Sequence, residues 1–517
     1  MVSSLTYDNK NMIFFTPSLL LVIMTFFVSM ENTNGLDDSL IDSCKNEGML
    51  NLSKMNIEHI NSEFIISSEI SCLDLSFNHL RTISPTAFDK SPNLTYINLS
   101  NNPFSMDHFF DSIFHTLPTD SLRILVLNEI GTMRFSPAVA ISYTRNPIYN
   151  LNSLYLQSNR LTELPGSLNL YWSDLKQLYL SNNKLTVVKS LNFPISLTHL
   201  DLSSNRLYEV DITDLTNLQH LDISDNFKIL HICSNDCNRF STSIKTNNKK
   251  RSVFRSKLRP EFSHDFIDYL DNFNDYHRST STTTEYDYTE EPVINNDNNF
   301  LNLSNLFALN HLNASKNKID TLDVDAFVDS YNLVTLDLSF NNLNFIADEV
   351  FKNLSALKNV YINNNELVYI PHVCELTSLE NFDLSGNQIS NVLSGAFCGS
   401  PTLKVLRLNR NKIDIIKGKA FEGLASLKFL DLSHNMLKSL PDNWMSPQNK
   451  LETLLLQSNY FDSLSKIPLS SAKALNHLYL YNNTFQVVGD LYLKSLINYP
   501  QNLTLHLELM SVNAILT

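Results

Sequence analysis

Apolar residues recur along most of the chain in the pattern LxxLxLxxNxL, in which x is mostly polar. The segments Leu73–Leu80, Leu200–Leu207, Leu336–Leu343 and Leu430–Leu437 all have this pattern. The alternation LxL predicts a short strand whose leucines lie on one face and whose x residues lie on the other. Successive copies are mostly 24 residues apart and run in the same direction, so the strands are predicted to be parallel.

Each copy carries an asparagine at the point where the chain leaves the strand. Its amide can donate hydrogen bonds to loop backbone and accept them, which satisfies polar groups that stacking would otherwise bury. Degenerate copies without this asparagine begin at Leu50, Leu122 and Leu503. The fourteen intact copies predict a structural ladder made of Asn78, Asn102, Asn159, Asn183, Asn205, Asn226, Asn317, Asn341, Asn365, Asn387, Asn411, Asn435, Asn459 and Asn483.

A unit of about 24 residues cannot bury its apolar face alone, so neighbouring units stack and share one core. Phenylalanines six residues before the next strand should stack as an aromatic spine in that core, and they are Phe88, Phe327, Phe351, Phe397 and Phe421. The returning side is bulkier than the strand side, so the stack should curve. We predict an α/β solenoid, or horseshoe, of about 17 repeats, with a parallel β-sheet on the concave face and an irregular or short helical convex side.

Composition narrows the function. The chain has 517 residues, only 10 glycines and a formal net charge of −14. An acidic surface disfavours nucleic acid as the main partner, because neutralising phosphates needs basic groups. The glycine-rich phosphate loops GxGxxG and GxxxxGK[ST] are absent, and so are GxSxG, HExxH and paired CxxC. The sequence therefore predicts a protein that is not an enzyme and uses no cofactor.

The N-terminus predicts export. The apolar run Met12–Val28 follows Lys10 and precedes a polar stretch, and it is short for a membrane span. Thr33 and Gly35 have the small side chains expected at a cleavage site, so residues 1–35 are predicted to be a signal peptide. An uncleaved signal anchor is the alternative. No second apolar run of about 18 residues follows, so no further membrane span is predicted.

The rest divides into an N-terminal repeat block (36–230), an insertion (231–300) and a C-terminal repeat block (301–517). The insertion is rich in charged residues, serine, threonine and asparagine, which predicts disorder. It contains a dibasic run, Lys249–Arg251, as a candidate processing site, and Tyr286 and Tyr288 among acidic neighbours as candidate sulfation sites. A surface insertion without function is the alternative.

Six cysteines fit three disulfides in an exported chain. Cys44 and Cys72 lie around the first degenerate strand, so a bond between them would form a minimal N-terminal cap. Cys374 and Cys398 occupy the same position in consecutive copies, within disulfide reach, and two free buried thiols are the alternative. No cysteine cap follows the last copy; a polar final turn, a covering partner or a longer chain could each account for that.

Cys233 and Cys237 lie at the start of the insertion and can close a small loop. Together with His231 they could instead contribute to a zinc site. The spacing matches no strong zinc signature, so a disulfide is the favoured interpretation and no metal is predicted.

Eight N-x-S/T sequons are candidate glycosylation sites in an exported chain: Asn51, Asn93, Asn98, Asn302, Asn313, Asn353, Asn482 and Asn502. Asn51, Asn98 and Asn313 are central x residues of LxL, so glycans there would obstruct the concave face. Two windows of that face stay open, at about 124–301 and 315–476.

Outward strand positions in these windows supply the candidate ligand-binding residues. Those of the first window are Tyr155, Tyr179, His199 and His220, whose histidines could also respond to pH. In the second window Val405, Phe429 and Leu455 predict an apolar patch, bordered by Arg407, Asp431 and Tyr479. Contiguous apolar exposure on a secreted protein is typical of a partner surface, although drift could also place a few apolar residues there.

The repeats resemble those of extracellular leucine-rich-repeat proteins of the 24-residue class, which includes Toll-type receptor ectodomains and small leucine-rich proteoglycans. The resemblance covers the chain from about Cys44 onward, apart from the insertion. It implies a secreted or cell-surface protein that binds a protein or microbial ligand through the concave face, with innate immunity as a candidate setting. Homodimers and heterodimers are compatible with this function. The alternative is a matrix, adhesion or developmental structural protein, because the fold does not specify the ligand.

Overall fold

A computed structural model describes residue 44 and residues 48–104, 117–118, 120–130, 150–164, 172–212, 214–226, 231–233, 300–301, 303, 305–397, 400–446, 449–485, 499–500 and 502–507. The chain divides into two units, residues 1–234 with 298–517, and residues 235–297. The second unit lies outside the described residues, and so do the expected signal peptide, the dibasic run, Tyr286 and Tyr288. The fold described below is that of the first unit.

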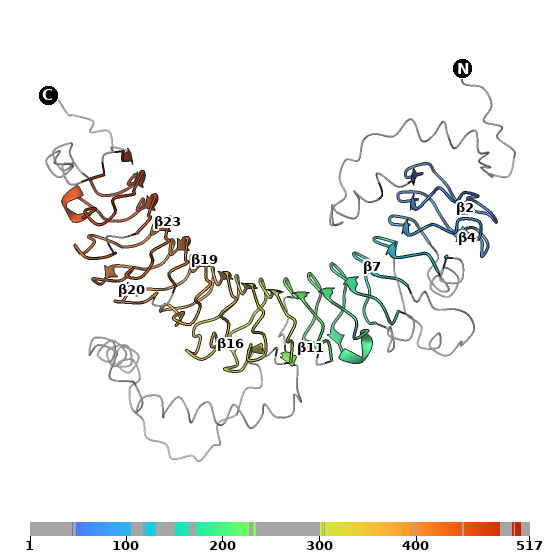
Figure 1. Cartoon of the computed structure of the whole chain (residues 1–517), viewed down its shortest axis with the longest axis horizontal. Coiled ribbons are helices and arrows are strands. Elements are labelled where there is room, and N and C mark those ends of the chain that lie inside the picture. Colours follow the sequence, from blue (N-terminus) through green and yellow to red (C-terminus); the bar gives the residue numbers. More distant parts are fainter. Residues whose placement is uncertain are drawn as a thin grey trace, which may run out of the picture. The chain divides into compact units, whose positions relative to one another are not determined.

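Seventeen three-residue strands form one parallel sheet (Figure 1). The fourteen intact and three degenerate copies each supply one strand, so the predicted number of repeats and their direction are confirmed. The strands are β1 (Met49–Asn51), β3 (Cys72–Asp74), β5 (Tyr96–Asn98), β6 (Ile124–Val126), β7 (Ser153–Tyr155), β8 (Gln177–Tyr179), β10 (His199–Asp201), β12 (His220–Asp222), β15 (His311–Asn313), β17 (Thr335–Asp337), β18 (Asn359–Tyr361), β19 (Asn381–Asp383), β21 (Val405–Arg407), β23 (Phe429–Asp431), β24 (Thr453–Leu455), β25 (His477–Tyr479) and β26 (Thr504–His506).

The register of this sheet is the same from copy to copy, including across the insertion. Leu200 pairs with Leu221 of the next strand, and Leu221 pairs with Leu312 although 91 residues separate them. The insertion therefore leaves the stacking of the coils unchanged, and β12 and β15 are direct neighbours. The long sheet lines the concave side of these stacked coils (Figure 1).

The returning side of the coils is irregular, with short strands and 3₁₀ turns among the described residues. β2 (His59–Ile60) pairs with β4 (Thr82–Ile83), and β20 (Asn391–Val392) pairs with β22 (Ile415–Ile416). A five-stranded sheet contains β9 (Val187–Val188), β11 (Glu209–Asp211), β13 (His231–Cys233), β14 (Phe300–Leu301) and β16 (Thr321–Leu322). The 3₁₀ helices are η2 (Ser190–Asn192) and η4 (Leu464–Lys466).

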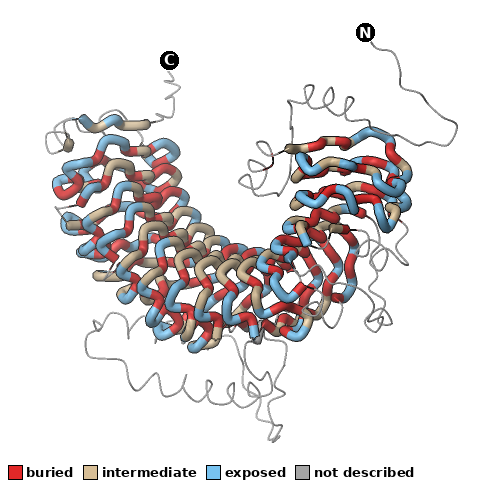
Figure 2. Tube along the Cα trace, turned by 45° about the vertical axis from the view of Figure 1, so that its right-hand side comes forward, coloured by how far each residue is buried: buried red, intermediate tan, exposed pale blue. Residues whose placement is uncertain are grey.

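One continuous apolar core lies between the long sheet and the returning side (Figure 2). In the long sheet the central residue of each strand except that of β26 is buried in it, and the five phenylalanines of the spine are at most 2 % exposed. The rings of Phe397 and Phe421 stack with centroids 5.7 Å apart, and Trp444 continues the row with an edge-on contact at 5.8 Å. Each coil therefore shares its core with its neighbours, as the repeat pattern predicts.

The fourteen ladder asparagines are buried, and each lies in the turn that follows its strand. Asn435 is representative: its Nδ2 donates to the carbonyls of Leu408 (2.9 Å) and Leu432 (3.0 Å), and its Oδ1 accepts from the Ile413 amide (3.0 Å). One side chain thus satisfies backbone groups of its own coil and of the preceding coil.

The residue before each ladder asparagine adopts a left-handed backbone conformation, with φ between +52° and +66°. Only one of the fourteen is a glycine, Gly386, although glycine adopts this conformation at least cost. Phe77 and Phe340 occupy it with bulky side chains that are about half exposed. The tight turn and the buried amide therefore override the local preference of these residues.

Candidate binding surfaces

The first and third residues of each strand point away from the core and form two columns along the long sheet. We call the surface made by these side chains the sheet face. Its character changes along the chain, so it is described in order from β1 to β26.

An apolar group, the N-terminal cluster, occupies the sheet face from β1 to β8. Its buried members are Cys44, Cys72, Tyr96, Val126 and Tyr155, and Met49, Ile124 and Tyr179 pack at its margin. The predicted disulfide between Cys44 and Cys72 is present. Its predicted role needs correction, because Cys72 is an outward residue of β3 and both cysteines belong to this cluster, not to the main core. The bond ties residue 44 to the sheet face instead of covering the end of the core.

Burial in the N-terminal cluster changes the set of candidate residues. The Tyr155 side chain is 0 % exposed and stacks on Tyr179, with ring centroids 4.3 Å apart. A ligand at the surface cannot reach it, so Tyr155 is removed from the binding residues, whereas Tyr179 is half-buried and remains. Burial also raises the pKa of the Asp74 carboxyl, and burial with the charge of Asp74 raises the pKa of Tyr96.

Three histidines follow on adjacent strands, and we call them the histidine ladder: His199, His220 and His311. Their rings stack nearly parallel, with centroids 4.1 Å apart between the first two and 4.5 Å apart between the last two. All three are half-buried. The alignment follows from the sheet register, which places the three residues side by side.

The second column places an acidic or amide side chain beside each ladder histidine. Asp201 Oδ1 accepts from the backbone N (2.9 Å) and the Oγ (2.7 Å) of Ser203. Asp222 makes the same bonds to its own serine, and its Oδ2 also accepts from Asn313 Nδ2 at 3.0 Å. These bonds fix the carboxylates in place on the strand.

Electrostatics distinguish the centre of the histidine ladder. Burial lowers the pKa of His220 to about 4, and the charges of His199 and His311 act in the same direction. Burial raises the pKa of Asp222, while the hydrogen bonds from its serine and from Asn313 oppose that shift. The middle imidazole is therefore neutral at physiological pH.

His311 was missed from the sequence because its strand follows the insertion and carries the Asn313 sequon. One signal could have found it. Counting ladder asparagines makes Asn317 the direct successor of Asn226, and that places His311 beside His220.

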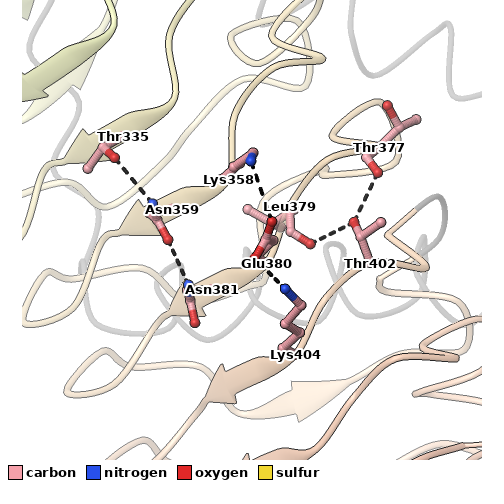
Figure 3. Close-up of polar contacts among 9 residues, drawn as sticks. All are labelled: Thr335, Lys358, Asn359, Thr377, Leu379, Glu380, Asn381, Thr402 and Lys404. Carbon is pink, nitrogen blue, oxygen red and sulfur yellow. Dashed lines mark hydrogen bonds and ion pairs between the residues drawn. The ribbon is translucent and has the colours of Figure 1, made fainter.

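Polar side chains bonded to one another occupy the sheet face from β17 to β19 (Figure 3). Asn381 Nδ2 donates to Asn359 Oδ1 (2.7 Å), and Asn359 Nδ2 donates to Thr335 Oγ1 (3.2 Å). Just before the strands, the Glu380 carboxylate lies between Lys358 (3.7 Å) and Lys404 (2.6 Å). The hydrogen bond from Lys404, with the charges of both lysines, lowers the pKa of Glu380.

Apolar side chains return on β21 to β24, where the structure places the C-terminal patch: Val405, Phe429 and Leu455. All three are half-buried. Val405 and Phe429 are register neighbours, and Leu455 lies diagonally beside Phe429 on the next strand. These side chains were predicted from the sequence to form a patch, and the sheet register places them on adjacent strands.

The border of the C-terminal patch carries charge and a further aromatic pair. The Arg407 guanidinium lies 5.5 Å from the centre of the Phe429 ring, a cation–π distance, and Asp431 is its register neighbour. Tyr479 stacks on His506 with centroids 4.0 Å apart. His506 belongs to a degenerate copy and was not among the candidate residues predicted from the sequence.

The sequons differ in exposure. Asn93, Asn353, Asn482 and Asn502 are exposed, and Asn51 and Asn313 are half-buried. Asn98 is 9 % exposed, and its Oδ1 accepts from the Ser100 amide, so its burial argues against a glycan at this position. Asn302 lies outside the described residues.

The remaining cysteines are only partly described. Cys374 is disulfide-bonded, and Cys398, its expected partner, lies outside the described residues. Cys233 ends β13, while Cys237 is also outside them. Within the described part of the chain, no group of three or more His, Cys, Asp or Glu side chains is arranged to hold a metal ion.

Comparisons with known proteins agree with this architecture. A family model described as "Leucine rich repeat" matches residues 48–104, 149–207, 307–367, 331–389 and 377–437, and a second model of that description matches residues 93–117. Podocan of Mus musculus is 24 % identical over 366 residues, 62 % of this chain and 57 % of podocan. Lumican of Oryctolagus cuniculus is 36 % identical over 185 residues, 34 % of this chain and 90 % of that protein.

Adenylate cyclase of Schizosaccharomyces pombe is 25 % identical over 358 residues, and the chain spans 20 % of its length. The chain thus spans about half of podocan and a fifth of the cyclase. Among solved structures, a leucine-rich-repeat protein of Leptospira interrogans is similar, with 20 % identity and a TM-score of 0.52 over 92 % of this chain and 100 % of that one.

The mouse RP105/MD-1 complex has 20 % identity and a TM-score of 0.50, over 88 % of this chain and 79 % of the matched one. These structural likenesses show the fold. Nowhere in the described ranges is a helix both long and apolar enough to cross a bilayer.

Proposed function

The chain belongs to the leucine-rich-repeat proteins, and from that premise we propose that it is an extracellular binding protein. It is secreted or displayed on the cell surface, and its sheet face recognises a protein or microbial ligand. Side chains held on short strands of a continuous sheet are fixed before the ligand arrives, so little ordering is needed on binding.

The C-terminal patch is the observation that carries this proposal. Three apolar side chains on adjacent strands remain only half-buried although the main core lies directly beneath them. Arg407 over the ring of Phe429 and Tyr479 at the border add the residue types that dominate binding energy at protein interfaces. An apolar centre with a polar rim is the usual arrangement of such a surface.

The class of the ligand sets the biological role. A microbial ligand would place the protein in innate immunity, and a matrix or cell-surface protein would place it in adhesion or development. Both roles use the same face, so the first experiment asks whether the C-terminal patch is the contact.

Phe429→Asp places a charge at the centre of the C-terminal patch, and Asn359→Asp places the same charge on the same column three strands away. Secreted wild-type protein and both variants are immobilised and incubated with host extracellular extract and with microbial lysate, and captured proteins are quantified by mass spectrometry. We expect at least one partner retained by wild type and Asn359→Asp to fall about tenfold or more with Phe429→Asp, as for a residue worth about 2 kcal/mol.

Equal recovery of every wild-type partner by Phe429→Asp would overturn this site. Circular dichroism of both variants shows whether the fold is kept, so a loss of capture can be assigned to the surface.

A further inference from the structure

We propose that the histidine ladder and the aspartates beside it form a second docking surface, for a basic protein segment, that is occupied at neutral pH and vacated in mild acid. The inference rests on the proposed use of the sheet face for binding. It concerns strands β8 to β17, which lie outside the C-terminal patch, and it requires that Asn313 of β15, whose Nδ2 donates to Asp222, carries no glycan.

Charge is the first argument. Between β8 and β19 the outward positions carry four carboxylates, Asp201, Asp222, Asp337 and Asp383, and no lysine or arginine. In the described part of the chain, none of these aspartates forms a salt bridge. A surface with this excess of negative charge fits a basic partner.

The arrangement of the side chains favours arginine in that partner. The carboxylates of Asp201 and Asp222 are register neighbours on adjacent strands and are held by their own serines. A planar guanidinium can donate two hydrogen bonds to a carboxylate and can stack on an aromatic face. Tyr179, next to Asp201 in the same column, is an aromatic side chain in reach of that contact.

The histidine ladder makes this surface sensitive to pH. His220 is packed between His199 and Asp201 of β10 and His311 and Asn313 of β15. Lys176 before β8, Tyr179 of β8 and Asp337 of β17 are the next titratable groups. Protonation adds positive charge within the stacked rings, directly beside the carboxylates, and offsets their attraction for a basic segment.

Stacking determines which rings can take up the protons. His220 has an imidazole at 4.1 Å on one side and one at 4.5 Å on the other, so a charge there meets two neighbours. Its pKa of about 4 keeps it neutral in mild acid. A charge on either end ring, His199 or His311, would meet one ladder neighbour instead of two. His220, the central ring of the ladder, therefore remains neutral.

The test uses a fluorescent peptide of nine arginines and the full-length secreted protein, with binding measured by fluorescence anisotropy at pH 7.4 and 5.5 in the same salt. We expect the dissociation constant of the wild type to rise at least tenfold in acid. In His199→Gln/His311→Gln, which keeps the central ring, the dissociation constant should change less than threefold between pH 7.4 and pH 5.5. Asp201→Asn/Asp222→Asn should weaken binding at pH 7.4 at least fivefold.

A matched control is Asp89→Asn/Asp174→Asn, which removes two exposed carboxylates on the returning side. It should leave both affinities unchanged. Binding that is equal in all variants would place the peptide elsewhere and overturn the proposal. Tighter binding in acid, or acid release that persists in the histidine variant, would overturn it as well.

Histidine hydrogen–deuterium exchange on the wild type provides a readout without a ligand. Exchange at the imidazole C2 position across pH 4 to 8 should show that the pKa of His220 is well below 6.5, and an ordinary histidine midpoint for His220 would contradict the ladder. Failure of these tests leaves the capture experiment on Phe429 standing, so the two proposals can fail separately.

Discussion

The two ends of the sheet face are built on the same repeat and differ in what their outward residues do. From β1 to β8 the apolar outward residues gather in the N-terminal cluster, where most are buried and a disulfide holds them. From β10 to β25 the outward residues are mostly polar or charged and half-buried, with one apolar interruption at the C-terminal patch. The core beneath both is continuous. The leucine spacing therefore determines the sheet. The outward x residues determine whether the sheet face packs against other parts of this chain or stays available to a partner.

Substitution of two valines is the strongest test of whether the two ends of the sheet face differ in packing. Val126 is 1 % exposed within the N-terminal cluster, and Val405 is half-buried in the C-terminal patch. Val126→Asp buries an unpaired carboxylate, so we expect it to lower the free energy of unfolding by about 3–5 kcal/mol. Val405→Asp leaves its charge in reach of water, and we expect a loss below about 1 kcal/mol.

Urea denaturation followed by circular dichroism measures both valine variants, and limited proteolysis locates the region that opens. Cleavage should concentrate in the first coils for Val126→Asp. Equal destabilisation by the two substitutions would mean that the two ends of the sheet face do not differ in packing.

Substitutions in the asparagine ladder test the other half of the comparison, which is that the core beneath the sheet face is alike at both ends. Asn102 and Asn435 make matching bonds: each Nδ2 donates to two leucine carbonyls, and each Oδ1 accepts from a backbone amide at 3.0 Å. Replacing either with alanine leaves buried backbone groups unsatisfied, at a cost of about 1–3 kcal/mol. We expect the two losses, measured by urea denaturation, to agree within about 0.5 kcal/mol. A much smaller loss at one end would show that its turns are held by other contacts.

The fold could be predicted from the sequence because its determinants are local and repeated. The LxL alternation predicts the strand, the asparagine predicts the turn, and the interval between copies predicts the register. Each signal occurs many times, so an isolated departure such as Ile130 in an asparagine position does not change the predicted fold. The left-handed residue before each asparagine escaped notice because Phe77, Lys316 and Asp225 share no side-chain chemistry.

The surfaces were predictable only in part, because burial of an outward residue depends on what packs over it. Tyr155 and Phe429 are both aromatic outward residues of the long sheet, yet one is fully buried and the other is half-buried. Likewise the sequence placed Cys72 in a cap, since its pairing can be guessed from spacing but the side of the sheet on which the bond lies cannot. His311 could be placed beside His220 only with the sheet register across the insertion.

The smallest expected effect is on the pH dependence of stability, and it concerns the histidine ladder in the polar part of the sheet face. The pKa of His220 is about 4 in the folded protein and about 6.5 when unfolded, so between these values the unfolded chain binds more protons and stability falls as pH falls. His220→Gln removes that dependence. The stability of wild type relative to this variant should therefore decrease from pH 7 to pH 4.5, by on the order of 1 kcal/mol after allowance for solvent screening at a half-exposed ring. Thermal unfolding at the two pH values measures the difference, with the exposed His79→Gln as control. If the His220 difference stays constant with pH, the stacked rings do not resist protonation, and the polar part of the sheet face is simply solvated.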